Sequence, residues 1–154
     1  MASTHSVSAQ IEILAPPATV RLVFLDFARY DQWHKGWTVE PIEAEKPSEL
    51  QIGDRLKVNM HGMVFRPVVA ENSPECFIWE GSLSVIITGK HWFYFSPSKE
   101  NPGGTTFIQS EKFTGLLTAL LWPWRNKKYE PSENWKTFNA ALKKEAEKSS
   151  QIYH

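Results

Sequence analysis

The chain has very little cysteine: Cys76 is the single one in 154 residues. It cannot form an internal disulfide, so a disulfide-held scaffold is excluded and a reducing, cytoplasmic location is expected.

His5, His61 and His154 lack the spacing of a metal site. Gly103-Gly104 does not build a phosphate-binding loop. We therefore expect no metal, no nucleotide and no other cofactor.

The sequence also lacks an excess of charge of either sign. It has 17 Lys and Arg against 17 Asp and Glu, with a formal net charge of zero. Without a broad positive field, a nucleic-acid partner is not expected.

Long hydrophobic runs are missing too. The longest apolar stretch, residues 116–124, is interrupted by Thr118 and Pro123 and is too short to cross a bilayer. Residues 1–10 contain neither a basic start nor an apolar run, so they do not resemble a signal peptide. At 154 residues the chain is expected to form one soluble domain over 1–154, with its core over about 7–147.

Aromatic side chains are abundant, at 13% of residues including seven tryptophans. Seven tryptophans exceed what a minimal core needs, and large rings also line apolar binding sites. The composition therefore favours a protein that encloses an apolar small molecule.

The periodicity of the first residues predicts a strand and then a helix. Val7 to Leu14 alternates polar and apolar residues, as a half-buried strand does. Pro17 suits the first turn of a helix. An apolar stripe of Val20, Val23, Phe24 and Phe27 would follow on that helix, and a second short helix is expected over 29–33.

The remaining pattern predicts a set of strands and one long helix. Strands are expected at 38–45, 55–60, 64–71, 77–83, 89–96 and 105–113, and short turns between them imply antiparallel neighbours. Trp135, Phe138, Leu142 and Ala146 share one face of a helix over 132–148. The predicted class is α+β, a curved antiparallel sheet of about seven strands around a long C-terminal helix, with two short helices after strand one.

A hairpin across the turn at 101–104 would set the register of the last two strands. His91 would then face Glu111, Phe93 would face Gln109, and Phe95 would face Phe107, all on one side of the sheet. The other side would carry Lys90, Trp92, Ser110 and Lys112, so the first side is expected to face inward.

An inward His91 beside Glu111 has two interpretations. The imidazole suits a general base oriented by the carboxylate, because histidine exchanges a proton near neutral pH. The alternative, which we favour slightly, is a structural hydrogen-bonded pair under the helix.

Several other residues are candidates for contact with a ligand. Asn139 projects from the inner helix face, where it either binds a ligand carbonyl or satisfies polar groups of the sheet. Trp33, His34 and Trp37 form either an aromatic wall or ordinary core. The sequence does not decide whether the side chains of Asn59 and Arg66 point inward or outward. The full set expected to bind the ligand is Trp33, His34, Trp37, Trp79, Phe93, Gln109, Phe113, Trp135, Phe138 and Asn139, with His91 and Glu111 as the catalytic pair.

Five segments resemble the START-like superfamily, in particular its polyketide cyclase/dehydrase and lipid-transport branch. They are APP at 15–17, DFARYDQW at 26–33, GDRL at 53–56, HWF at 91–93 and EKFTGLL at 111–117, and FNAAL at 138–142 is similar to the family's closing helix. The resemblance runs from Val7 to Glu147 and implies a helix-grip fold with an internal cavity. WPWRNKK at 122–128 departs from the family pattern.

Three functions follow as hypotheses. The first is an enzyme that cyclises or dehydrates a polyketide-like or aromatic molecule, in which confinement of the chain lowers the entropic cost of reaction. The second is a non-catalytic carrier or sensor of a lipid-like ligand. The third, least favoured, is an interaction module. Residues 116–128 are expected to form a lid rather than a membrane-docking edge, and nothing in the pattern indicates an oligomeric state.

Overall fold

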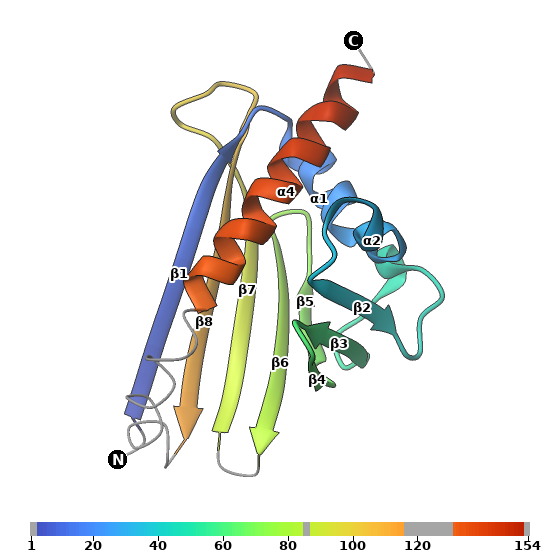
Figure 1. Cartoon of the computed structure of the whole chain (residues 1–154), viewed down its shortest axis with the longest axis vertical. Coiled ribbons are helices and arrows are strands. Elements are labelled where there is room, and N and C mark those ends of the chain that lie inside the picture. Colours follow the sequence, from blue (N-terminus) through green and yellow to red (C-terminus); the bar gives the residue numbers. More distant parts are fainter. Residues whose placement is uncertain (1–2, 85–86, 116–130, 153–154) are drawn as a thin grey trace.

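A computed structural model describes residues 3–84, 87–115 and 131–152. Within these residues the chain forms a large five-stranded antiparallel sheet and a three-stranded sheet, with a long C-terminal helix lying across the large sheet (Figure 1). The α+β class and the helix-grip arrangement predicted from the sequence are confirmed.

The large sheet has the strand order β1-β8-β7-β6-β5. These strands span Ser3–Ile13 (β1), Thr105–Gly115 (β8), Ile87–Pro97 (β7), Cys76–Ser84 (β6) and Val68–Asn72 (β5). The first strand therefore pairs with the last, which places both next to the helix that follows.

The small sheet has the order β2-β3-β4, with β2 at Trp37–Pro41, β3 at Leu56–Met60 and β4 at Met63–Phe65. Here the structure differs from the prediction of one strand over 64–71 and about seven strands in all. The predicted strand is divided at Pro67, whose nitrogen cannot donate to a ladder. The strand expected over 38–45 is shorter in the structure and ends at Pro41.

Short helices connect β1 to β2, as predicted. Helix α1 covers Pro17–Leu25, the 3-10 helix η1 covers Phe27–Arg29, and α2 covers Tyr30–Trp33; a further 3-10 helix, η2, covers Pro47–Glu49. Helix α1 ends at Leu25, because the backbone of Asp26 leaves the helical conformation, with φ −79° and ψ 62°. The Asp26 N–H still donates to the carbonyls of Leu22 and Val23 and closes the last turn.

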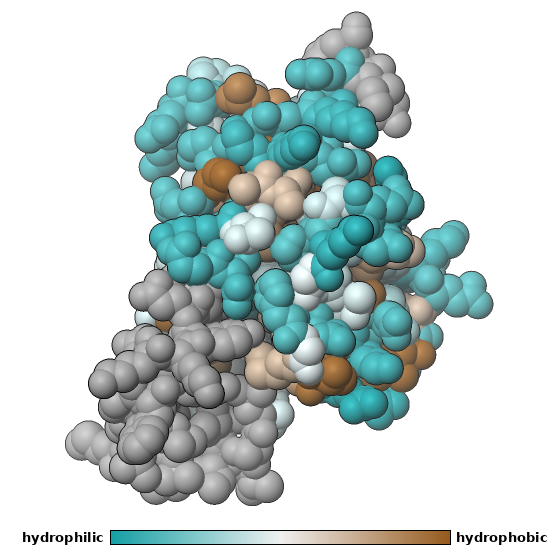
Figure 2. Space-filling view, viewed as in Figure 1, coloured by the Kyte–Doolittle hydropathy of each residue, from teal (hydrophilic) through white to brown (hydrophobic). Residues whose placement is uncertain are grey.

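Helix α4 covers Pro131–Ile152 and buries one face against the large sheet and α1. The buried positions Trp135, Phe138, Leu142 and Ala146 recur at helical spacing. Figure 2 shows mostly hydrophilic side chains on the side of the molecule that carries the outer face of α4. Polar bonds hold the helix to the end of β1, where Glu147 accepts from the Leu14 N–H at 2.9 Å and Lys143 donates to the Glu12 carbonyl at 2.8 Å.

The core lies between α4 and the inner faces of both sheets. Phe24 of α1 stands at its centre, with ring centroids of Phe93, Phe95 and Phe77 at 4.6, 5.4 and 5.6 Å. Aromatic side chains of β6 and β7 therefore pack around Phe24.

Candidate functional site

Four polar side chains form a continuous chain across β8, β7 and α4. Glu111 Oε2 lies 3.4 Å from His91 Nδ1, and His91 Nε2 lies 2.9 Å from Gln109 Oε1. Gln109 Nε2 then donates to Asn139 Oδ1 at 2.6 Å. We call Glu111, His91, Gln109 and Asn139 the polar relay. All four are predicted site residues, and the structure brings them together.

Cross-strand register positions three members of the relay. His91 is directly opposite Glu111, and Phe93 is directly opposite Gln109, in the register that the hairpin predicted. Because side chains alternate between the faces of a strand, these residues all point inward. Lys90 and Lys112 pair on the opposite face, as predicted.

Gly89 leaves room for the carboxylate at the end of the relay. A Cβ at this position would lie 2.8 Å from Glu111 Oε1, closer than ordinary contact. The absence of a side chain at position 89 therefore allows Glu111 to turn toward His91.

Aromatic rings surround His91 on three sides. Its ring stacks on Phe93 with centroids 4.2 Å apart and planes 13° from parallel, and it contacts Trp135 at 4.8 Å and Trp79 at 5.6 Å. His91, Gln109 and Asn139 are each at most 1% exposed, whereas the Glu111 side chain is 19% exposed. Glu111 is thus the member of the relay that solvent reaches.

Both ring nitrogens of His91 face protein groups. Nε2 is held by Gln109 and Nδ1 faces Glu111, so neither points toward a free space. Of these two partners, only the Glu111 carboxyl group can accept or release a proton, because a side-chain amide does not ionise in this way. This geometry favours an indirect role for His91.

A second cluster of predicted residues packs around Phe138. The Trp37 ring stacks on the Phe138 ring, with centroids 4.1 Å apart and planes 12° from parallel. His34 meets Phe138 edge-on at 5.2 Å, and Trp33 lies at 5.6 Å. We call Trp33, His34, Trp37 and Phe138 the aromatic wall. Burial of His34, together with the nearby charge of His61, lowers the pKa of its imidazole.

Three buried polar atoms have no hydrogen-bond partner among the residues that the structure describes. They are His34 Nε2, Trp37 Nε1 and Asn139 Nδ2. Buried polar groups in folded proteins are nearly always hydrogen-bonded, so each of these atoms needs a partner that the described residues do not supply. All three belong to residues that the sequence predicted to contact a ligand.

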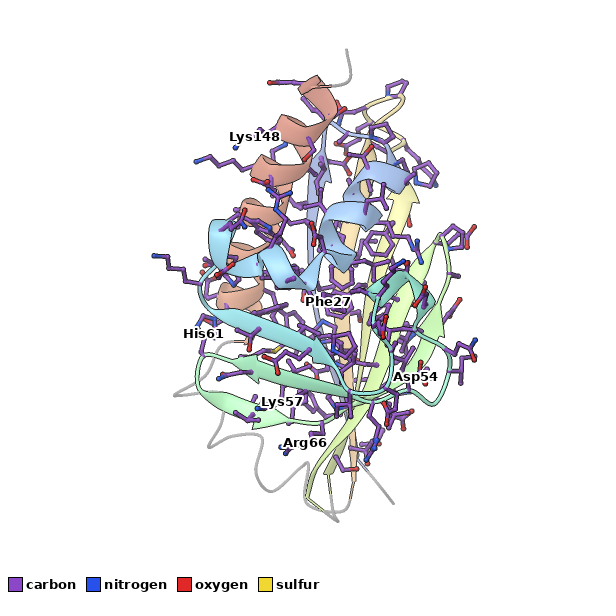
Figure 3. The ribbon with its side chains drawn as sticks, turned by 90° about the vertical axis from the view of Figure 1, so that its right-hand side faces the viewer. Phe27, Asp54, Lys57, His61, Arg66 and Lys148 are labelled. Atoms are coloured by element: carbon purple, nitrogen blue, oxygen red, sulfur yellow. The ribbon has the colours of Figure 1, made fainter. Side chains whose placement is uncertain are left out.

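Of the other predicted residues, Trp79, Trp135 and Phe113 are buried on the inner side, as expected. The sequence left open where Asn59 and Arg66 point. In the structure Asn59 accepts from the Gly62 N–H at 2.8 Å in the β3–β4 turn, and Arg66 is exposed. Figure 3 shows His61 at that turn and Phe27 in the interior. The predicted lid over 116–128 falls outside the described residues.

Sequence reasoning missed two buried contributors. Phe24 belongs to the predicted apolar stripe of α1, but the stripe gave no sign that its ring is central to the core. The Tyr30 hydroxyl donates to the Phe24 carbonyl at 2.5 Å, and burial raises the pKa of Tyr30 well above its usual value. Only tertiary packing shows that these residues fix the end of α1.

No group of three or more His, Cys, Asp or Glu among the described side chains could hold a metal ion. In the same part of the chain, no helix is both long enough and apolar enough to span a membrane.

The sequence matches the family model described as polyketide cyclase/dehydrase and lipid transport over residues 4–147. The chain belongs to this family. The description of this family agrees with the START-like resemblance. The family and the fold together point to a domain that binds hydrophobic ligands. No curated protein matches the sequence significantly.

Solved structures with this fold come from distant proteins. Norcoclaurine synthase from Thalictrum flavum is 10% identical with a TM-score of 0.70, and the match covers 95% of this chain and 96% of that one. A hypothetical protein from Helicobacter pylori is 12% identical with a TM-score of 0.68, covering 94% and 88%. A protein from Thermus thermophilus is 16% identical with a TM-score of 0.65, covering 95% and 99%. At these identities the likeness shows the fold alone.

Proposed function

We propose that the protein binds an aromatic or polyketide-like small molecule in an internal cavity between the large sheet and α4, and orients a polar group of that molecule. The observation that carries this proposal is the set of three unpartnered buried atoms on His34, Trp37 and Asn139. His34 and Trp37 contact the ring of Phe138, and Asn139 is the next residue of α4. A ligand with rings and polar groups would satisfy both the aromatic wall and these atoms.

The geometry supports a carrier or sensor best. Both nitrogens of His91 are engaged by protein groups, so the imidazole holds the relay in place without a free nitrogen for a ligand. The family description includes lipid transport, which fits a domain whose task is to enclose an apolar molecule.

Catalysis is the second candidate, favoured by one observation. The Glu111 side chain is partly exposed, and its Oε2 atom lies next to His91 Nδ1. A carboxyl group in this position could pass a proton to a ligand or take one from it. Such a group would serve a cyclisation or dehydration. A norcoclaurine synthase structure with this fold is in complex with dopamine and hydroxybenzaldehyde, so the fold accommodates small aromatic molecules in that protein.

Native mass spectrometry of the purified protein tests the proposal. We expect a co-purified apolar molecule, released when the protein unfolds. The same measurement on a Glu111→Gln variant separates the two candidates, because the catalytic candidate depends on this carboxyl group. An identical molecule in both proteins indicates a carrier, whereas a heavier precursor in the variant, differing by one water, indicates a dehydration.

Binding of 2-acetonaphthone, an apolar aromatic ketone, gives a second test. Trp37→Phe keeps a ring on Phe138 but removes the free N–H, and we expect the dissociation constant to rise about tenfold. Trp92→Phe, on the opposite face of the sheet from His91, is the matched control and should leave it unchanged. Equal binding by both variants and the wild type, with no co-purified molecule, would contradict the proposal.

A further inference from the structure

The hydrogen-bond pattern of the polar relay requires a proton between His91 and Glu111. Gln109 Nε2 donates to Asn139 Oδ1, so Gln109 turns its Oε1 acceptor toward His91. His91 Nε2 must then carry the hydrogen in that bond. Its Nδ1 faces Glu111 Oε2 at 3.4 Å, and two lone pairs would repel there unless a proton lies between them. In this arrangement the His91–Glu111 pair holds two protons and is neutral overall.

Removal of one proton reverses the two hydrogen bonds that involve the amides, the one between His91 and Gln109 and the one between Gln109 and Asn139. The remaining proton would sit on Nδ1, where it bonds to the Glu111 carboxylate, and Nε2 would become an acceptor. Gln109 must then turn its amide nitrogen to His91 and its oxygen to Asn139. Asn139 in turn must donate to Gln109, which leaves its oxygen, instead of its nitrogen, without a partner.

We infer that Asn139 determines which polar group of a ligand the site accepts, and that the proton on the His91–Glu111 pair sets this preference. With two protons on the pair, Asn139 offers the free N–H seen in the structure, which suits a carbonyl. With one proton, it offers an oxygen, which suits a hydroxyl. The preferred ligand in the arrangement described here is thus an apolar molecule that carries a ketone, aldehyde or quinone oxygen.

Solvent supplies the proton through Glu111, the only exposed member of the relay, at 19% of its side chain. No charged side chain among those described faces the pair from the elements packed against it; the titratable residue with the nearest register position is His5, on the same face of β1 as Val7 and opposite Phe113. Strand β6 contributes Trp79, α4 contributes Trp135 and Asn139, and β1 places Val7 opposite Glu111. The nearest lysines, Lys90 and Lys112, lie on the opposite face of the sheet.

Nitrogen-15 NMR of histidine-labelled protein tests the relay without any ligand. As the pH rises and the pair loses a proton, we expect the neutral His91 ring to carry its hydrogen on Nδ1. The side-chain amide signals of Gln109 and Asn139 should shift with the same midpoint. A neutral His91 that keeps its hydrogen on Nε2, or amide signals that do not move, would overturn the inference.

A matched pair of ligands tests the preference, which rests on the proposed function. The probes are 2-acetonaphthone, which only accepts hydrogen bonds, and 1-(2-naphthyl)ethanol, its reduced form, which also donates. Above the midpoint found by NMR, the ketone should bind about tenfold more weakly per pH unit, because only the two-proton form accepts it. The alcohol should change by no more than about twofold, since it satisfies either arrangement.

Glu111→Gln supplies the decisive variant, because a neutral amide at this position can donate to or accept from His91 Nδ1. Ketone binding should persist and lose its pH dependence. Glu80→Gln, on the exposed face of β6, is the control and should behave as wild type. Ketone binding that is equally independent of pH in all three proteins overturns the inference but leaves the proposed function intact. A reversal seen by NMR with no binding of either probe contradicts the proposed function and leaves the proton-coupled relay in place.

Discussion

The ring of Phe138 stacks on that of Trp37, joining the C-terminal helix to the first strand of the small sheet. Phe138 is fully buried, and Tyr30 also packs against it, with ring centroids 5.7 Å apart. The Phe138 side chain thus joins α4 to both α2 and β2.

Truncation of this side chain should be costly. Phe138→Ala is expected to lower the free energy of unfolding by about 3–5 kcal/mol, because it removes a buried ring and leaves a cavity. Urea denaturation followed by circular dichroism measures the change. Lys144→Ala, on the exposed side of the same helix, is the control and should stay within about 0.5 kcal/mol. A loss below about 1 kcal/mol for Phe138→Ala would show that the aromatic wall is loosely packed.

His34 should make the protein sensitive to acid. Its folded-state pKa is lowered, chiefly by burial and further by His61, so the unfolded chain takes up a proton more readily. The resulting stability is present above the unfolded pKa of about 6.5 and is lost as the pH falls through the folded pKa. His34→Gln should therefore lose less stability than the wild type between about pH 7 and pH 5.

Urea denaturation at a series of pH values measures that difference. His61→Asn is the control, since it removes the neighbouring imidazole but keeps His34. It should retain most of the acid sensitivity. Parallel curves for His34→Gln and the wild type would contradict the assignment.

Gly36 and His61 should be energetically coupled. A Cβ at position 36 would clash with the imidazole of His61, although Gly36 itself has no positive φ. With His61 replaced by Ala, Gly36→Ala should stabilise the protein by about 0.4–1 kcal/mol, because it restricts the unfolded chain. In the wild-type background the same change should stabilise less or destabilise. A double-mutant cycle measured by thermal unfolding checks this, and additive effects would contradict the contact.

The single thiol should be unreactive in the folded protein. Burial, with added repulsion from Glu71, raises the pKa of Cys76 to about 12, so little thiolate exists near neutral pH. Reaction with Ellman's reagent should be at least about a hundredfold slower than in urea. A native rate close to the rate in urea would show that the start of β6 opens readily.

Much of the large sheet was predictable because buried and less buried residues alternate along β7 and most of β8. The register of His91 with Glu111 followed from the turn at 101–104 and the pairing of apolar residues on one face. The division at Pro67 had a signal in the sequence, since proline interrupts a ladder, but the apolar residues on both sides outweighed it. The bond from Gln109 to Asn139 could not be predicted. Helical periodicity shows which face is buried, but not which sheet residue each position meets.

That amide bond also constrains how α4 can dock. Apolar side chains such as Trp135 and Leu142 would tolerate a shift of the helix along the sheet, because hydrophobic contacts have little directional preference. A shift by one turn would separate Asn139 from Gln109 and leave both side-chain amides buried without the bond between them. The polar relay therefore fixes the position of α4 along the sheet. Its hydrogen bonds form at one axial position of the helix and are lost at the neighbouring positions, which apolar packing alone would allow.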